Sequence, residues 1–241
     1  MTRNGWDEVF TLSSHRNNAN GPVQGQYLLG YLVHISDPWF PDSTRAMMTG
    51  MMRDRLEEGF ILDRRWFWLL GEMERTKRPA LLALARIFAE AEVPYAIIGG
   101  IALQVHQAEP RTTLDIDVAV VTYGELPRTQ LETAGFRCTG RSSRPENWVG
   151  PEGTPVQFTD DPALAAAIAR AEEIELEDVR LRVVSRTDLL HEKLRAASDP
   201  ARRRSKRLQD LADAQALLES TPALEQELSS AERAILNRLP H

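Results

Sequence analysis

The most constraining feature of this sequence is the stretch IIGGIALQVHQAEPRTTLDIDVAVV, residues 97–121. A short apolar run ends in Gly99 and Gly100, and a helix-like segment then leads to a β-branched run that carries two aspartates. Because side chains alternate along a strand, Asp115 and Asp117 are expected to face the same way. Two carboxylates this close each disfavour the ionised form of the other unless a cation neutralises them.

A divalent ion would relieve this repulsion. Oxygen ligands on a stiff strand suit Mg²⁺ or Mn²⁺, which take the rest of their shell from water and substrate phosphates. The two glycines let the backbone approach a ligand closely, and the following helix offers free N–H groups and a partial positive charge to a phosphate. A D-x-D pattern alone also fits a solvated strand edge. The order strand, Gly-Gly, helix and acidic strand favours a phosphate site beside a metal site.

Helical and extended patterns alternate from Pro79 onward. The expected helices are 79–92, 101–107, 125–134, an alanine-rich helix after Pro162, and a long region from 187 to about 239 that is broken near residues 199–200 and 221–222. The expected strands are 95–98, 112–121, 156–159 and 179–184, with a ragged hairpin between 137 and 155. This order predicts an α+β (mixed α/β) fold, in which a mixed sheet is flanked by helices and followed by a helical C-terminal region.

Three segments are expected along the chain: residues 1–72, a core at 73–185 and a helical region at 186–241. Residues 1–72 show no sustained period, and we assign them no fold. Two expectations stay open for them: a poorly ordered segment, or a stretch that precedes the natural start of the protein. The second rests on the methionines at positions 47, 48, 51, 52 and 73.

Composition excludes several classes of protein. The chain has 241 residues, a net charge of −6 and one cysteine. Cys138 therefore has no partner within the chain for a disulfide or a thiolate zinc site. No run reaches the roughly 18 apolar residues of a membrane span, and the first residues lack the apolar core of a signal peptide. We expect a cytoplasmic protein with no membrane partner.

The motifs GGIAL and RTTLDID resemble those of the nucleotidyltransferase superfamily that includes DNA polymerase β. They are most similar to those of AbiEii-type nucleotidyltransferases of bacterial abortive-infection and toxin–antitoxin systems. The resemblance spans about residues 80–160, with a looser helical match through residue 218. It implies nucleotide binding by Gly99, Gly100, Arg111 and Thr113, and metal binding and catalysis by Asp115 and Asp117.

One position departs from the family pattern. A third carboxylate usually stands on a later strand, and the matching stretch TPVQFTDDP has Gln157 there. A glutamine side chain is neither a general base nor an anionic metal ligand. Asp160 or Asp161 would be the nearest replacement, but both are also suited to cap the helix that begins at Pro162.

The segment 180–207 has ten Lys or Arg against three acids, which calls for an anionic partner. By the same resemblance, Lys193 points toward the triphosphate and Asp210 lies near the site. The helix that carries Lys193 is expected to be capped by Ser185 or Thr187. The arginines 202–204 fit either contacts with RNA phosphates or a solvated helix face. In the latter case the buried stripe would be Leu208, Leu211, Ala212, Gln215 and Leu218.

These features predict a metal-dependent nucleotidyltransferase with Mg²⁺ or Mn²⁺ as cofactor and an NTP as substrate. The acceptor would be a hydroxyl group of RNA or tRNA, of a protein, or of a small molecule such as an antibiotic. A toxin of this type would have a cognate antitoxin as partner. The alternative is a degenerate, non-catalytic protein that binds a nucleotide or RNA and acts with a partner, and Gln157 favours it.

Overall fold

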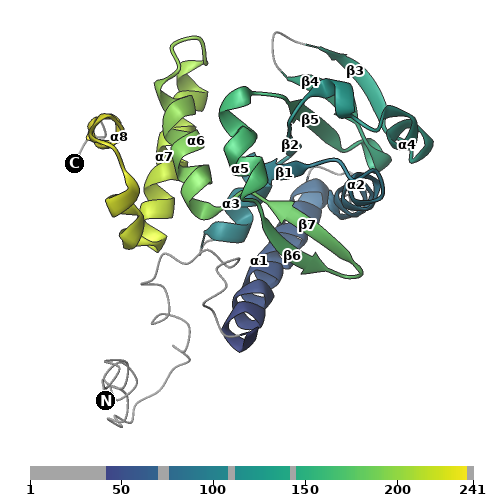
Figure 1. Cartoon of the computed structure of the whole chain (residues 1–241), viewed down its shortest axis with the longest axis horizontal. Coiled ribbons are helices and arrows are strands. Elements are labelled where there is room, and N and C mark those ends of the chain that lie inside the picture. Colours follow the sequence, from purple (N-terminus) through teal and green to yellow (C-terminus); the bar gives the residue numbers. More distant parts are fainter. Residues whose placement is uncertain (1–41, 70–75, 108–111, 142–144, 238–241) are drawn as a thin grey trace, which may run out of the picture.

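The computed structural model describes residues 42–69, 76–107, 112–141 and 145–237 (Figure 1). Within these ranges the centre is a seven-stranded sheet of order β3-β4-β5-β2-β1-β7-β6. Its strands are β1 (Tyr95–Ile98), β2 (Ile116–Val120), β3 (Arg137–Arg141), β4 (Glu146–Val149), β5 (Pro155–Thr159), β6 (Glu172–Leu176) and β7 (Val179–Val183). β2 pairs parallel with β5, β1 pairs parallel with β7, and the other neighbours are antiparallel. The predicted mixed sheet is confirmed.

Helices flank this sheet and continue beyond it. They are α1 (Asp42–Leu69), α2 (Arg78–Glu90), α3 (Gly99–His106), α4 (Arg128–Thr133), α5 (Ala165–Ala169), α6 (Arg186–Ser198), α7 (Arg204–Ser220) and α8 (Ser230–Leu236), with short 3-10 turns η1 (Tyr123–Glu125), η2 (Pro151–Gly153), η3 (Pro162–Leu164) and η4 (Pro222–Glu227). α2 packs on β7, α3 packs on β1 and β2, and α1 packs on α3 and β6. Figure 1 shows α6, α7 and α8 together on one side of the sheet, as expected for a helical C-terminal region.

Helix α2 follows the predicted pattern. Leu81, Leu84 and Phe88 recur at three- and four-residue spacing and are buried on one face. A proline in the first turn is tolerated because the first N–H groups of a helix have no partner within it. The ring of Phe88 lies 6.0 Å from that of Phe158 on β5, so α2 is fixed to the middle of the sheet. The helix ends just before Glu92, which has φ 52°, a conformation that a helix does not continue through.

The strand that carries the aspartates is shorter than predicted. We expected residues 112–121, and β2 covers only Ile116–Val120. Its antiparallel partner β1 ends at Ile98, opposite Asp117, because the chain turns into α3 at Gly99. No β1 residue is left to pair with the residues before Ile116. Asp115 therefore lies in the loop ahead of the strand.

Two other elements differ from the prediction. β6 was missed, although its sequence EEIEL alternates between buried and exposed positions as a half-buried strand should. The expected helix 125–134 is instead the short turn η1 followed by α4, because Pro127 between them lacks the N–H that a continuous helix needs.

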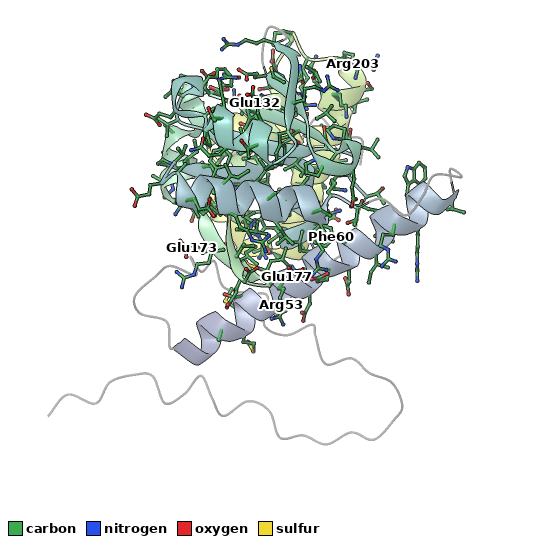
Figure 2. All side chains as sticks on the ribbon, turned by 90° about the vertical axis from the view of Figure 1, so that its right-hand side faces the viewer. Arg53, Phe60, Glu132, Glu173, Glu177 and Arg203 are labelled. Carbon is green, nitrogen blue, oxygen red and sulfur yellow. The ribbon has the colours of Figure 1, made fainter. Side chains whose placement is uncertain are left out.

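Residues 42–69, to which we assigned no fold, form helix α1. Met52, Leu56 and Phe60 are spaced by four residues and are 6%, 0% and 3% exposed. Gly59 allows close approach to α3, since a Cβ there would lie 2.6 Å from the side chain of Gln104. In Figure 2 α1 runs across the body of the molecule, with Phe60 in its middle part. The packing joins α1 to the core, whereas the boundary at residue 72 and residues 1–41 lie outside the described ranges.

We therefore expect Leu56→Ala to destabilise the protein by about 2–5 kcal/mol, because it leaves a cavity between α1 and the core. Ile61→Ala on the same helix is the matched control, since Ile61 is 49% exposed. Its cost should stay within about 0.5 kcal/mol. Urea unfolding of the three proteins measures both values, and equal stability of Leu56→Ala and wild type would show that α1 does not contribute to the core.

The C-terminal helices begin and end near the predicted breaks. Ser185 caps α6 by accepting a hydrogen bond from the N–H of Asp188, as one of the two expected caps. The predicted buried stripe of α7 is partly wrong, because Leu208 is 54% exposed. The buried face includes Asp210 and Asp213 instead, and these acids bond to groups on α6 and in the loop before α7. Within the described residues, no helix is long and apolar enough to cross a membrane.

Candidate active site

A cleft of about 630 Å³ opens where β2 and β5 meet helices α1, α3, α6 and α7. It brings together most of the residues that the sequence singled out, namely Gly99, Gly100, Thr113, Asp115, Asp117, Gln157, Lys193 and Asp210. Asp160 is not among the residues that line the cleft. Arg111, which we expected beside the nucleotide, lies outside the described residues.

The two glycines make room for the side chains opposite them. Gly99 has φ 64°, and a Cβ there would lie 2.1 Å from Oδ2 of Asp117. A Cβ on Gly100 would lie 2.3 Å from Oγ1 of Thr113. The backbone of α3 therefore begins in direct contact with the acidic loop and strand. No side chain caps this helix at Ile98, so its first N–H groups stay available to an anion.

Asp117 is held on the central strand β2, opposite Ile98 on one side and Gln157 on the other. Burial and, second, the neighbouring charge of Asp115 raise the pKa of Asp117 to about 7. The positive charges of Lys193, Arg202 and Lys206 act in the opposite direction on this pKa. Three cationic side chains of the C-terminal helical region thus face the acidic strand across the cleft.

Asp115 is fixed by hydrogen bonds rather than by the strand ladder. Thr113 Oγ1 donates to Asp115 Oδ1 over 3.1 Å. Gln157 Nε2 donates to Asp115 Oδ2 over 3.3 Å. Gln157, which stands where a third carboxylate was expected, therefore orients an acid here and does not add a negative charge.

The residues present fit a divalent cation. Among the described residues no group of three or more His, Cys, Asp or Glu side chains could hold a metal ion. The two acids that lie together beside α3 are Asp115 and Asp117, whereas Glu192 and Asp210 line the cleft from α6 and α7. Oxygen donors of this kind suit Mg²⁺ or Mn²⁺, which keep several waters or substrate oxygens in their shell. The raised pKa of Asp117 means that the ionised pair is disfavoured without a cation, and a bound cation would remove that penalty.

Lys193 and Asp210 form an ion-pair network on the opposite wall. Lys193 Nζ lies 3.0 Å from Asp210 Oδ1 and 2.8 Å from Asp213 Oδ2. Arg202 Nε lies 2.6 Å from Asp210 Oδ2. The network ties α6 to α7 and holds the Lys193 ammonium at the cleft, where its charge acts on Asp117.

Several residues of the cleft and of the ion-pair network beside it were not singled out from the sequence as site residues. Asp213 is one helical turn beyond Asp210 on the same buried face, and that spacing was a usable signal. Trp66 on α1 lines the cleft and is 46% exposed. Glu192, the residue before Lys193, also lines the cleft. Lys206 is recognised only from the tertiary structure, because many basic residues surround it in the sequence.

The two acids that follow β5, Asp160 and Asp161, are not among the residues that line the cleft. Asp161 caps η3 by accepting a hydrogen bond from the N–H of Ala163, which confirms the capping interpretation for this residue. Its carboxylate also pairs with Arg195 over 2.8 Å.

Comparisons with known proteins agree with the sequence resemblance. Residues 149–241 match the family described as "Nucleotidyl transferase AbiEii toxin, Type IV TA system". The matched part contains Gln157, Lys193 and Asp210, whereas Asp115 and Asp117 precede it. A search of curated proteins finds no match.

Similar solved structures include three proteins. An antigenic nucleotidyltransferase-like protein from Paracoccidioides brasiliensis is 18% identical over 66% of this chain and 91% of its own, with a TM-score of 0.39. The antibiotic-resistance factor ANT(2'')-Ia is 18% identical over 67% of this chain and 96% of its own, with a TM-score of 0.43. The protein JHP933 from Helicobacter pylori is 16% identical over 64% of this chain and 68% of its own, with a TM-score of 0.41.

Proposed function

The chain is an AbiEii-like member of the nucleotidyltransferase superfamily, and from this membership we propose that it transfers a nucleoside monophosphate from an NTP to a hydroxyl acceptor. The observation that carries the proposal is the charge arrangement of one cleft. Asp115 and Asp117 lie beside the turn into α3, and Lys193, Arg202 and Lys206 face them. Such a cleft suits a polyanion that is held partly through a divalent cation and partly through ammonium and guanidinium groups.

Each wall of the cleft has its own part in substrate binding under this proposal. The N–H groups at Gly99 and Gly100 bind phosphate oxygens of the NTP, and Lys193 adds a positive charge to the same group. Thr113 contributes to the nucleotide site through its hydrogen bond to Asp115. The sequence resemblance assigns the same role to Arg111, which lies outside the described residues. Asp210 acts indirectly, because its carboxylate holds Lys193.

Asp115 and Asp117 would hold Mg²⁺ or Mn²⁺, which supplies positive charge to the phosphate and orients the acceptor hydroxyl. In the transfer, the acceptor oxygen forms a bond to the α-phosphorus while the bond from that phosphorus to pyrophosphate breaks. Gln157 cannot take the hydroxyl proton because an amide is not a base, and under this proposal the proton is released to solvent. Arg202 and Lys206 face the charge that develops on pyrophosphate.

The partners follow from the same family. Its description as a type IV toxin supports a cognate antitoxin and a bacterial cytoplasmic setting as part of the proposal. We propose RNA, including tRNA, as the first acceptor to test. Arg203, labelled in Figure 2, and Arg204 are exposed next to the cleft and suit backbone phosphates.

A second function is favoured by one observation. Gln157 bonds to Asp115 in place of a third acid, so a protein that binds a nucleotide or RNA without turning it over also fits the cleft. Such a protein would act with a partner. It would bind NTP and metal normally and release no pyrophosphate.

The test is label transfer from each of four α-labelled NTPs, with Mg²⁺ or Mn²⁺, into total tRNA, protein and small-molecule fractions. Wild type is expected to label one fraction, and Asp115→Ala/Asp117→Ala to label none. Labelling by both proteins would contradict the assigned site. No labelling by a wild type that still binds NTP would favour the binding protein, and label in small molecules alone would replace RNA as the acceptor.

A further inference from the structure

A buried ion pair lies beneath the loop that carries Asp115. Asp63 belongs to α1, and Lys77 is the N-cap residue immediately before α2. Their side chains are 1% and 3% exposed. The ammonium of Lys77 donates both to Oδ2 of Asp63 and to the backbone carbonyl of Thr113.

Burial of this ion pair carries a desolvation cost for both charges. Desolvation lowers the pKa of Lys77 and raises that of Asp63, so each charge depends on the other. Buried ion pairs often contribute little net stability compared with apolar side chains of the same size. Asp63 also continues the buried stripe of α1, three residues beyond Phe60, where an apolar residue would be the ordinary choice. What distinguishes the pair is the group that it holds, the Thr113 carbonyl.

A continuous set of contacts leads from that carbonyl to the acidic site. Thr113 is packed against Gly100, where a Cβ would clash with its Oγ1. The same Oγ1 donates to Asp115 Oδ1 over 3.1 Å. Asp115 precedes β2, so no ladder pairing sets its position. The loop therefore depends on hydrogen bonds from side chains, and Lys77 supplies one of them.

We propose that Asp63 and Lys77 are positioning residues that fix the Thr113 carbonyl and thereby set the Asp115 carboxylate for a divalent cation. The inference rests on the proposed function, because it assigns the cation to Asp115 and Asp117. It makes α1 part of the site, and Trp66, one turn after Asp63 on the same helix, already lines the cleft.

The chain offers a matched control. Glu57 on α1 pairs with Arg78 on α2 over 2.6 Å, so this ion pair joins the same two helices beside Lys77. It does not include Thr113. Glu57→Gln therefore weakens the contact between the helices and leaves the anchored carbonyl in place.

The experiment measures Mn²⁺ binding to the full-length protein by electron paramagnetic resonance, per mole of folded protein. Lys77→Met should weaken Mn²⁺ binding by about tenfold or more, as loss of a supporting hydrogen bond does at other metal sites. Glu57→Gln should stay within about twofold of wild type. If Lys77→Met does not fold, Asp63→Asn, which removes the negative charge that holds the Lys77 ammonium, should weaken binding by at least about threefold.

Three results would overturn the inference. Wild-type affinity in Lys77→Met, or in Asp63→Asn if only that variant folds, would show that Asp115 is positioned without the pair. Equal losses in Lys77→Met and Glu57→Gln would assign the effect to helix packing in general. A wild type that binds no Mn²⁺ would remove the proposed metal site itself, and with it the inference.

Discussion

Asp117→Asn is expected to lower nucleotide transfer by at least about 10³-fold, equivalent to roughly 4 kcal/mol of transition-state stabilisation. The substitution keeps the size of the side chain and removes its carboxylate, so the cation would lose one of its two acidic ligands. Transfer of labelled nucleotide at saturating Mg²⁺ measures the change. Asp178→Asn, at an exposed carboxylate in the β6–β7 turn, is the control and should transfer as wild type does. A variant that kept even a tenth of the activity would contradict the role of Asp117.

Asp117→Asn should lower activity but, in the absence of metal, raise the stability of the folded protein relative to wild type at neutral pH. The pKa of Asp117 is raised from 3.8 to about 7, so the folded chain keeps this proton where the unfolded chain has released it. Folding then takes up a proton, and the stability of the wild type falls as pH rises through this window and stays lower above it. Asp117→Asn lacks this carboxyl. Its unfolding temperature in EDTA should fall less between pH 5 and pH 8 than that of wild type.

Gly99→Ala should have the second largest effect. The new Cβ would lie 2.1 Å from Oδ2 of Asp117, and φ of 64° is unfavourable for alanine. The backbone conformation alone costs about 1–2 kcal/mol. In addition, either α3 or Asp117 must move, and a displacement of about 1 Å at a catalytic group can cost about 10²-fold in rate. We expect both a lower unfolding temperature and a transfer rate reduced by about two orders of magnitude.

Gly135→Ala separates these two contributions. Gly135 also has a positive φ, 90°, but a Cβ there meets no atom within 4 Å. This variant should lose stability by about 1–2 kcal/mol and keep wild-type transfer and Mn²⁺ affinity. Transfer by Gly99→Ala at the rate of Gly135→Ala would mean that the contact with Asp117 is not needed for activity.

The fold was predictable where local patterns and tertiary structure agree. Strand β1, the turn at Gly99 and the helix after it appear as expected, because an apolar run, two glycines and helical spacing each act locally. The length of β2 was not predictable, since it depends on where its partner β1 ends. Helix α1 was missed because its outward side also carries large apolar residues such as Ile61, which obscures the buried stripe.

For the candidate site, the sequence was informative about the acids and less so about their surroundings. Two aspartates one residue apart after a Gly-Gly turn point to a shared cleft without any tertiary information. The contact of Gln157 with Asp115 required the register of β5 against β2. The pair of Asp63 and Lys77 required the packing of α1, and neither residue stands out among the charged residues of the sequence.

The cleft draws on residues from Trp66 on α1 to Asp210 on α7, so about three fifths of the chain separates its first contributor from its last. A ribosome makes the N-terminal part first, and domains fold as units while synthesis proceeds. A nascent chain that stops before α6 has both aspartates but lacks Lys193, Arg202 and Lys206, which face them. Incomplete products of translation therefore lack one wall of the cleft, and under the proposed function they would lack the cationic groups that bind the triphosphate.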